Sequence, residues 1–249
     1  MESRKIRDLS LIELDTDRTM VIACDSCGSI GMKSGDELKV PPIYVGKMTV
    51  RVAIMEVMCS GADIISVIDA VCNEMEPTGS EIIKGIKEEL KLAGIKDITL
   101  TGSTEENFKT CSTGLGITVV GIARNKTLKV NKVKGEALII SVGVPKVGNE
   151  INLFEDKEIV DYLSIKKLLE EESVYEIVPV GSKGIAYEME QLALNNKLTP
   201  WFEKETKVDL KKSAGPATCV IAAIDNESLK KMSHLVPNVN IIGVLKANK

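Results

Sequence analysis

Six acidic residues lie where predicted strands and helices end beside glycines or in short polar segments. Carboxylates that converge from separate elements suit Mg²⁺, which takes oxygen ligands and usually bridges substrate phosphates while keeping several waters. For each acid taken alone, the alternative is a solvated or helix-capping side chain. The sequence thus indicates metal-assisted phosphate chemistry. The six acids are Asp25, Glu56, Asp63, Asp69, Glu105 and Glu106.

Glu56 is the most informative of these acids because it lies within an apolar helix. Apolar residues recur at helical spacing over residues 46–60, and the neighbours of Glu56 are apolar almost all round. A carboxylate buried in such surroundings needs a partner. We therefore expect a compensating group near Glu56.

Two glycine-rich loops, residues 28–33 and 143–148, each combine glycines with a lysine. Backbone N–H groups beside close-approach glycines form phosphate cradles, and lysine adds a positive charge. Ordinary turns of this composition are also common. If the loops are cradles, the cofactor contacts are Gly28, Gly31, Lys33, Gly143, Lys146 and Gly148.

Several other mechanisms lack their motifs. There is no nucleophile elbow and no Walker loop, and the single histidine, His234, provides no His-based triad. Cys24 and Cys27 form one Cys-x-x-Cys pair, whereas zinc normally needs four ligands. A thioredoxin-like pair would open a helix, but this pair follows a predicted strand. A metal or redox protein using these two cysteines remains an alternative.

The composition is that of an ordinary globular protein, with 44% hydrophobic and 27% charged residues. The net charge of −4, with lysines and arginines scattered among acids, gives no basic face for nucleic acid. No apolar run approaches the roughly 20 residues that span a bilayer, and the N-terminal residues form no signal sequence. We therefore expect a cytoplasmic protein with neither nucleic acid nor membrane as a partner.

Strand and helix patterns alternate along the chain, which is typical of an α/β or α+β sandwich. A polar segment at 124–134 predicts the boundary between domains 1–130 and 131–249. The first strand is expected to end at Asp25, and Thr78 to begin a helix through a capping box. The expected strands cover residues 21–24, 64–71, 98–100, 116–123, 137–140, 217–224 and 239–245. The expected helices cover 46–60, 78–93, 159–171 and 184–195.

Five features in order resemble a known superfamily. It comprises aminoimidazole ribonucleotide synthetase, thiamine-monophosphate kinase, selenophosphate synthetase and a hydrogenase maturation protein. The features are an acid near the N-terminus, a strand followed by Asp and glycine, a helix acid five residues before Gly-Ala, a polar turn and a late Ser-x-Gly. Here they are Asp8, Asp25, Glu56, residues 101–104 and residues 182–184. The resemblance covers about residues 7–245.

The chain departs from the family pattern at two acids, which are replaced by Ser103 and Lys183. Losing two carboxylates predicts fewer or weaker metal ions. Lys183 would contact phosphate as a point charge, and Glu105 or Glu106 could restore one metal ligand.

The resemblance implies a two-domain α+β fold whose N-terminal halves form a shared β-barrel in a homodimer, with ATP and Mg²⁺ as cofactors. The implied metal ligands are Asp8, Asp25, Glu56, Glu105 and Glu106. The implied catalytic residues are Asp25, Asp69 and Lys183, with Asp69 or Asp63 orienting the acceptor hydroxyl. Gly102, Ser103 and Thr104 join the cofactor contacts.

Within the superfamily, residues 23–26 and 145–150 are most similar to the α-ribazole kinase of cobalamin lower-ligand salvage. This resemblance implies transfer to the 5′-hydroxyl of a nucleoside-like substrate. The alternatives are a thiamine-phosphate kinase-like enzyme, an ATP-driven synthetase and an ATP-binding scaffold without catalysis.

Overall fold

The computed structural model describes residues 2–247, and the chain divides into two compact units. The first unit contains the residues up to Val57 together with Ala62–Lys126. The second contains Met58–Gly61 and the residues from Thr127 onward. The division near Lys126 lies within the polar segment 124–134, and the turn after the first long helix belongs to the second unit.

The first unit is built on a six-stranded sheet. Its strand order is β1-β2-β3-β8-β6-β7, and only the pair β6–β7 is parallel. The strands are β1 (Ser3–Ile6), β2 (Leu9–Glu13), β3 (Arg18–Gly28), β6 (Asp63–Val71), β7 (Thr99–Ser103) and β8 (Gly114–Arg124). A short parallel pair, β4 (Ile30–Gly31) and β5 (Leu38–Lys39), follows β3.

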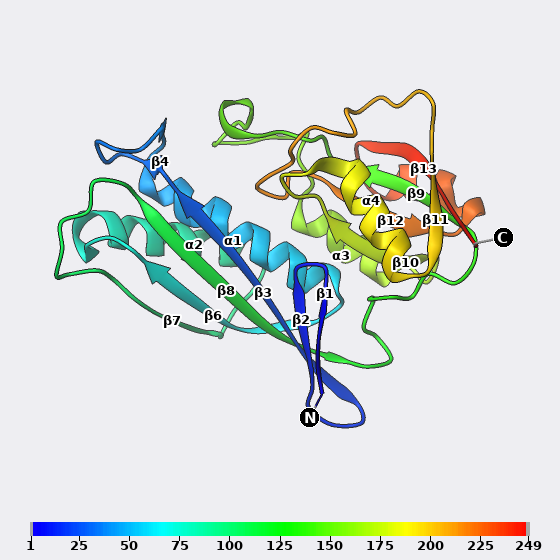
Figure 1. Ribbon diagram of the computed structural model, residues 1–249, viewed down its shortest axis with the longest axis horizontal. Coiled ribbons are helices and arrows are strands. Elements are labelled where there is room, and N and C mark those ends of the chain that lie inside the picture. The colour runs from blue at the N-terminus through cyan, green and yellow to red at the C-terminus, as the bar shows by residue number, and fades with distance from the viewer. Residues whose placement is uncertain (1, 248–249) are drawn as a thin grey trace. The chain divides into compact units, whose positions relative to one another are not determined.

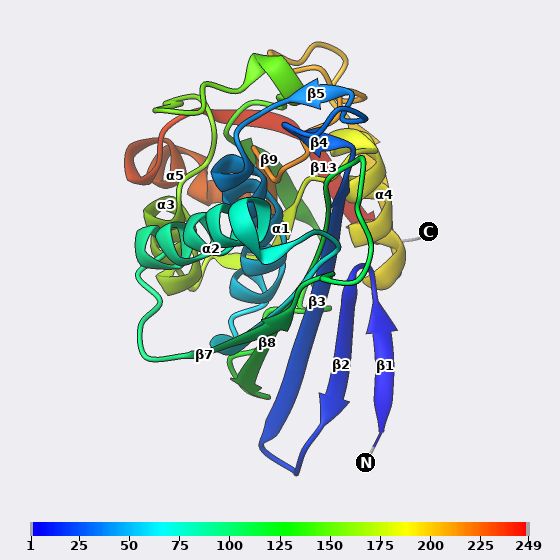
Figure 2. The ribbon, with the colours of Figure 1, turned by 90° about the vertical axis from the view of Figure 1, so that its left-hand side faces the viewer.

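Two helices, α1 (Pro42–Cys59) and α2 (Ser80–Leu92), lie along one face of this sheet (Figures 1 and 2). Residues of β8 are alternately buried and half-buried, as expected for a sheet with helices of its own unit on one face only. The two helices approach closely at Gly46 and Gly85. A Cβ at Gly46 would lie 2.1 Å from the Ile82 carbonyl oxygen, and one at Gly85 would lie 1.9 Å from that of Ile43. Glycine is therefore required where α1 and α2 cross.

Three local expectations for this unit were wrong. Asp25 lies within β3, because the ladder with β8 continues through Gly28. Thr78 does not cap α2, since its hydroxyl donates to Glu74 and the N-cap residue is Gly79. The expected turn at 101–104 begins as strand, because β7 pairs with β6 as far as Ser103.

The second unit is built on an antiparallel five-stranded sheet in the order β10-β12-β9-β13-β11. Helices α3 (Tyr162–Glu170) and α5 (Leu229–Leu235) lie on one side of it, and α4 (Gly184–Asn195) lies on the other (Figure 2). With both faces covered, every residue of β12 is buried. The strands are β9 (Ala137–Val142), β10 (Val174–Pro179), β11 (Leu198–Phe202), β12 (Val220–Ile224) and β13 (Val239–Ala247).

The predicted helix at 184–195 is confirmed at both ends by α4. The pattern analysis did not find β1, β2, β10, β11 or α5, which are short elements with weak periodicity. A mixed α+β fold is confirmed. Among the described residues, no helix is both long and apolar enough to cross a membrane.

Candidate functional site

Two carboxylates, Asp8 and Asp25, lie close together in the first unit. Leu9 pairs with Ala23, so the turn between β1 and β2 brings Asp8 beside β3 near Asp25. Burial raises the pKa of Asp25 to about 6, opposed by a hydrogen bond from the Ser26 N–H and assisted by the negative charge of Asp8. A half-buried carboxyl beside a second acid favours a bound cation or a proton.

Glu56 is buried on α1, and its partner is Arg7. The Arg7 Nη1 lies 3.8 Å from the Glu56 Oε2, and the two side chains are 4% and 9% exposed. The expected compensating group is therefore a protein cation from the turn between β1 and β2. Arg7 already balances the charge of Glu56.

The five proposed metal ligands do not form one cluster. Within the described part of the chain, no three His, Cys, Asp or Glu side chains are grouped so that they could hold a metal ion. Glu105 accepts hydrogen bonds from the N–H groups of Asn107 and Phe108, and Glu106 accepts from Met75 and Thr104. Mg²⁺ commonly takes one or two protein carboxylates and completes its shell with phosphates and waters. The Asp8–Asp25 pair fits this requirement, whereas the full set of five does not.

The first glycine loop is held by Asp36, which the sequence analysis did not identify. Asp36 accepts hydrogen bonds from the Thr113 N–H and hydroxyl, the Ser112 hydroxyl and the Lys33 N–H, at 2.7–3.0 Å. Burial opposes ionisation, but these donors keep the pKa of Asp36 below its usual value. A Cβ at Gly31 would lie 2.2 Å from the Thr113 hydroxyl, so this glycine makes room for the Asp36–Thr113 contact. Gly28 has open space around it.

Lys33 is already engaged by an acid distant in sequence. Its Nζ lies 2.8 and 3.0 Å from the two carboxylate oxygens of Glu74. Glu74 also accepts a hydrogen bond from Thr78. A phosphate would have to compete with Glu74 for this lysine.

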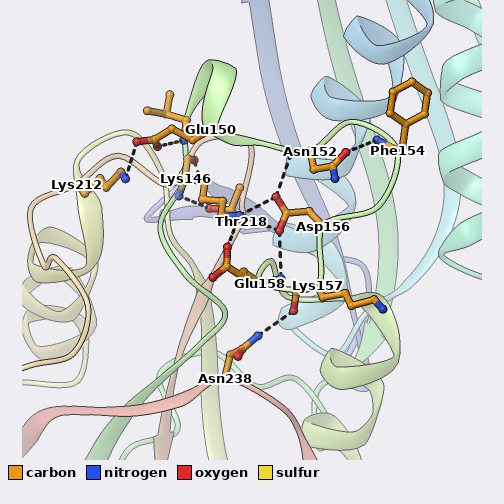
Figure 3. A network of polar contacts seen from close by, with 11 residues as sticks. Lys146, Glu150, Asn152, Phe154, Asp156, Lys157, Glu158, Lys212, Thr218 and Asn238 are labelled. Atoms are coloured by element: carbon orange, nitrogen blue, oxygen red, sulfur yellow. Dashed lines mark hydrogen bonds and ion pairs between the residues drawn. The ribbon is translucent and has the colours of Figure 1, made fainter.

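The lysine of the second glycine loop is likewise paired (Figure 3). The Lys146 Nζ lies 2.9 Å from both oxygens of Asp156 and 2.6 Å from Glu158. The Lys146 N–H donates to the buried Thr218 hydroxyl at 3.0 Å. Gly143 has φ +86°, and a Cβ there would lie 2.7 Å from the Thr218 carbonyl oxygen, whereas Gly148 has open space. These contacts fix the loop itself.

Lys183 precedes α4 and is exposed, with its Nζ 4.2 Å from the centre of the Tyr187 ring. This cation–π contact holds the ammonium near the N-terminus of α4. Its role in phosphate binding stays a prediction.

Asp69 and the segment around Gly102 line one pocket of about 310 Å³. Asp69 is 4% exposed, and burial raises its pKa. A Cβ at Gly102 would lie 2.3 Å from an Asp69 carboxylate oxygen, so Gly102 makes room for this side chain. Ser103 and Thr104 also line the pocket. Asp63 is not among its lining residues and lies exposed at the first position of β6.

Cys24 and Cys27 lie three residues apart on β3, so their side chains point to opposite faces of the sheet. Cys24 is exposed and Cys27 half-buried, and all six cysteines are free. Two thiols on opposite faces cannot share a metal ion or a disulfide in this arrangement.

Comparisons with known proteins agree with this architecture. Residues 7–123 match the family model for the AIR synthase related protein, N-terminal domain. None of the curated proteins matches the sequence. Among solved structures, PurL of Thermotoga maritima with ATP matches 96% of the chain at 14% identity and a TM-score of 0.72. The chain covers only 42% of that PurL chain.

Two shorter proteins have similar folds. One is HypE from a HypE–HypF complex, with 14% identity and a TM-score of 0.68. The alignment covers 96% of this chain and 87% of the HypE chain. The other is AaThiL with AMPPCP and TMP, with 12% identity and a TM-score of 0.64. The alignment covers 97% of this chain and 85% of the AaThiL chain. At these identities the likeness shows a shared fold. The first unit thus matches the AIR synthase-related N-terminal domain, and the whole chain shares its fold with these solved structures.

Proposed function

We propose that this protein is an ATP- and Mg²⁺-dependent phosphotransferase with an alcohol acceptor. The main support is the Asp8–Asp25 carboxylate pair in the unit that matches the AIR synthase-related domain. The same fold occurs in PurL with ATP and in AaThiL with AMPPCP. The Asp69 pocket adds a buried carboxylate that could receive a hydroxyl group.

Asp8 and Asp25 would hold Mg²⁺, which when bound neutralises charge on the nucleotide phosphates. Asp69 would accept a hydrogen bond from the acceptor hydroxyl and orient its oxygen. Backbone N–H groups of residues 101–104 would bind phosphate oxygens, together with those of residues 28–33 other than Ser29 and Lys33, whose N–H groups already donate to Thr113 and Asp36. Positioning and charge neutralisation supply most of the catalysis in phosphoryl transfer.

The acceptor is proposed to be a nucleoside-like molecule, with the 5′-hydroxyl of α-ribazole as the first candidate because of the resemblance at residues 23–26 and 145–150. A thiamine-type phosphate is the second acceptor to test. The fold likeness to AaThiL with TMP supports including it.

We also propose that the protein acts as a homodimer. On the sheet face away from α1 and α2, half-buried apolar residues of three strands lie side by side. They are Met20, Ile22, Ile68, Val120 and Ile122. Pairing this face with a second copy would bury it. Sedimentation at micromolar concentration is expected to give a dimer, and a stable monomer with full activity would argue against the shared barrel.

The decisive experiment is incubation with ATP, Mg²⁺ and a panel of ribosides and thiamine-type phosphates, followed by mass analysis for an added phosphate. We expect ADP to accumulate together with one phosphorylated alcohol. Asp25→Ala should abolish this turnover without unfolding the protein. ATP binding without any acceptor-dependent turnover would indicate a scaffold, and formation of an amide bond or ring would indicate a synthetase.

A further inference from the structure

The Asp69 pocket has walls from two parts of the first unit. Asp69 on β6 and residues 100–104 form one wall. Met75, Ile83 and Lys87 form the other, the last two from α2. Asp69 is 4% exposed, and none of the described residues donates a hydrogen bond to its carboxylate or forms an ion pair with it. A buried carboxylate without a partner is costly unless a ligand supplies one.

Lys87 is the cation of this pocket. It is exposed and forms no ion pair with any residue that the structure describes. The lysines of both glycine loops, in contrast, are held by acids: Lys33 by Glu74 and Lys146 by Asp156. Lys87 is therefore better placed to take a new anion, because no protein carboxylate has to be displaced first.

The surroundings of Lys87 are also basic. A wider hollow of about 630 Å³ adjoins the pocket through Met75, Ile83 and Lys87, and Lys84 and Lys91 line it as well. Its one acid, Glu88, lies 3.5 Å from Lys47 and is thereby partly neutralised. Lys84 lies 3.8 Å from Glu81, so the positive potential that would attract a phosphate comes from Lys87 and Lys91.

We infer that Lys87 binds the phosphoryl group that is transferred from ATP, while Asp69 on the facing wall binds the acceptor hydroxyl. This inference rests on the proposed function and deepens it, because it assigns donor and acceptor to the two walls of one pocket. Transfer requires both groups in contact and in line. A pocket with a free cation on one wall and a free carboxylate on the other meets this requirement.

The proposed transfer forms one bond to the γ-phosphorus and breaks another. The acceptor oxygen forms a bond to the γ-phosphorus, and the bond from that phosphorus to the β–γ bridging oxygen breaks. The bridging oxygen keeps the electron pair and leaves as part of ADP. The acceptor proton passes to the Asp69 carboxylate, whose pKa burial has raised, and then to solvent. Lys87 remains protonated and offsets the negative charge of the transferred group.

The test uses Lys87→Ala, Lys87→Arg and the control Lys84→Ala in the full chain. Lys84 is also exposed on α2, but it does not line the smaller pocket and lies 3.8 Å from Glu81. We expect Lys87→Ala to lower kcat/KM for ATP at least about tenfold. Lys87→Arg should restore most of the loss because it keeps the charge, and Lys84→Ala should match the wild type.

A second measurement separates this inference from the proposed function. Tripolyphosphate binding, followed by calorimetry without acceptor, should weaken in Lys87→Ala and not in Lys84→Ala. If the wild type turns over ATP but Lys87→Ala is unchanged in both measurements, the assignment of Lys87 is wrong while the kinase proposal stands. If the wild type binds tripolyphosphate through Lys87 but phosphorylates no acceptor, the kinase proposal fails and Lys87 is only an anion site. Equal losses in both alanine variants would show a general effect of charge on α2 and overturn the specific role.

Discussion

Replacing Asp25 with asparagine exchanges a half-buried carboxyl on β3 for a neutral group of similar shape. Burial in the folded protein raises the pKa of Asp25 from 3.8 to about 6. Because the folded-state pKa is the higher one, the carboxyl contributes its full stability below about pH 4, where it is protonated. That contribution falls as the pH rises and is lost above about pH 6. Asparagine does not titrate, so the variant should keep this stability as the pH rises.

The magnitude follows from the shift in the pKa. About two pKa units correspond to about 3 kcal/mol of unfolding free energy. This is an upper limit, because solvent screens a half-buried group. Linkage gives Asp25→Asn an advantage over the wild type of up to about 1 kcal/mol at pH 4.5 and up to about 3 kcal/mol at pH 7.5.

Urea unfolding at the two pH values, followed by circular dichroism, measures this difference. The control is Asp17→Asn, in the exposed turn between β2 and β3, which should show no such rise between the two pH values. If Asp25 binds Mg²⁺, the asparagine variant should also lose Mg-ATP turnover while it gains stability. An advantage that is equal at both pH values, or a variant less stable than the wild type at pH 7.5, would refute the reasoning.

Three further changes test other parts of the molecule. Asp36→Ala leaves the Thr113 N–H without its acceptor and should cost about 2–4 kcal/mol in urea unfolding at pH 7. Since the pKa of Asp36 is lowered, this cost should shrink as the pH falls and the wild-type carboxyl is protonated; a cost that does not change with pH would contradict it. The double variant Cys24→Ser, Cys27→Ser should keep most activity, and stoichiometric zinc that is lost together with activity would count against this. Lys183→Ala should raise the KM for ATP or lower kcat at least about tenfold, or ~1.4 kcal/mol; unchanged kinetics across a range of Mg²⁺ concentrations would make Lys183 an ordinary surface residue.

The sequence by itself determined most of the larger elements. The helix at 184–195 and the strand at 64–71 follow from the pattern of apolar residues, which is a local property. The burial of Glu56 and its need for a partner also followed from its apolar neighbours, because that argument depends on one helix only. The family resemblance, likewise stated from the sequence, is supported by the match of residues 7–123.

The tertiary structure alone decided which charged groups are free to bind a ligand. Glu74 is 41 residues from Lys33, and Glu56 reaches Arg7 only because the turn between β1 and β2 packs near α1. No local pattern encodes such pairs, since they depend on which strands and helices become neighbours. For the same reason the sequence pointed to the loop lysines Lys33 and Lys146 and gave no signal for Lys87. In the folded chain both loop lysines are paired with acids, whereas Lys87 and Asp69, which line one pocket, have no ionic partner among residues 2–247.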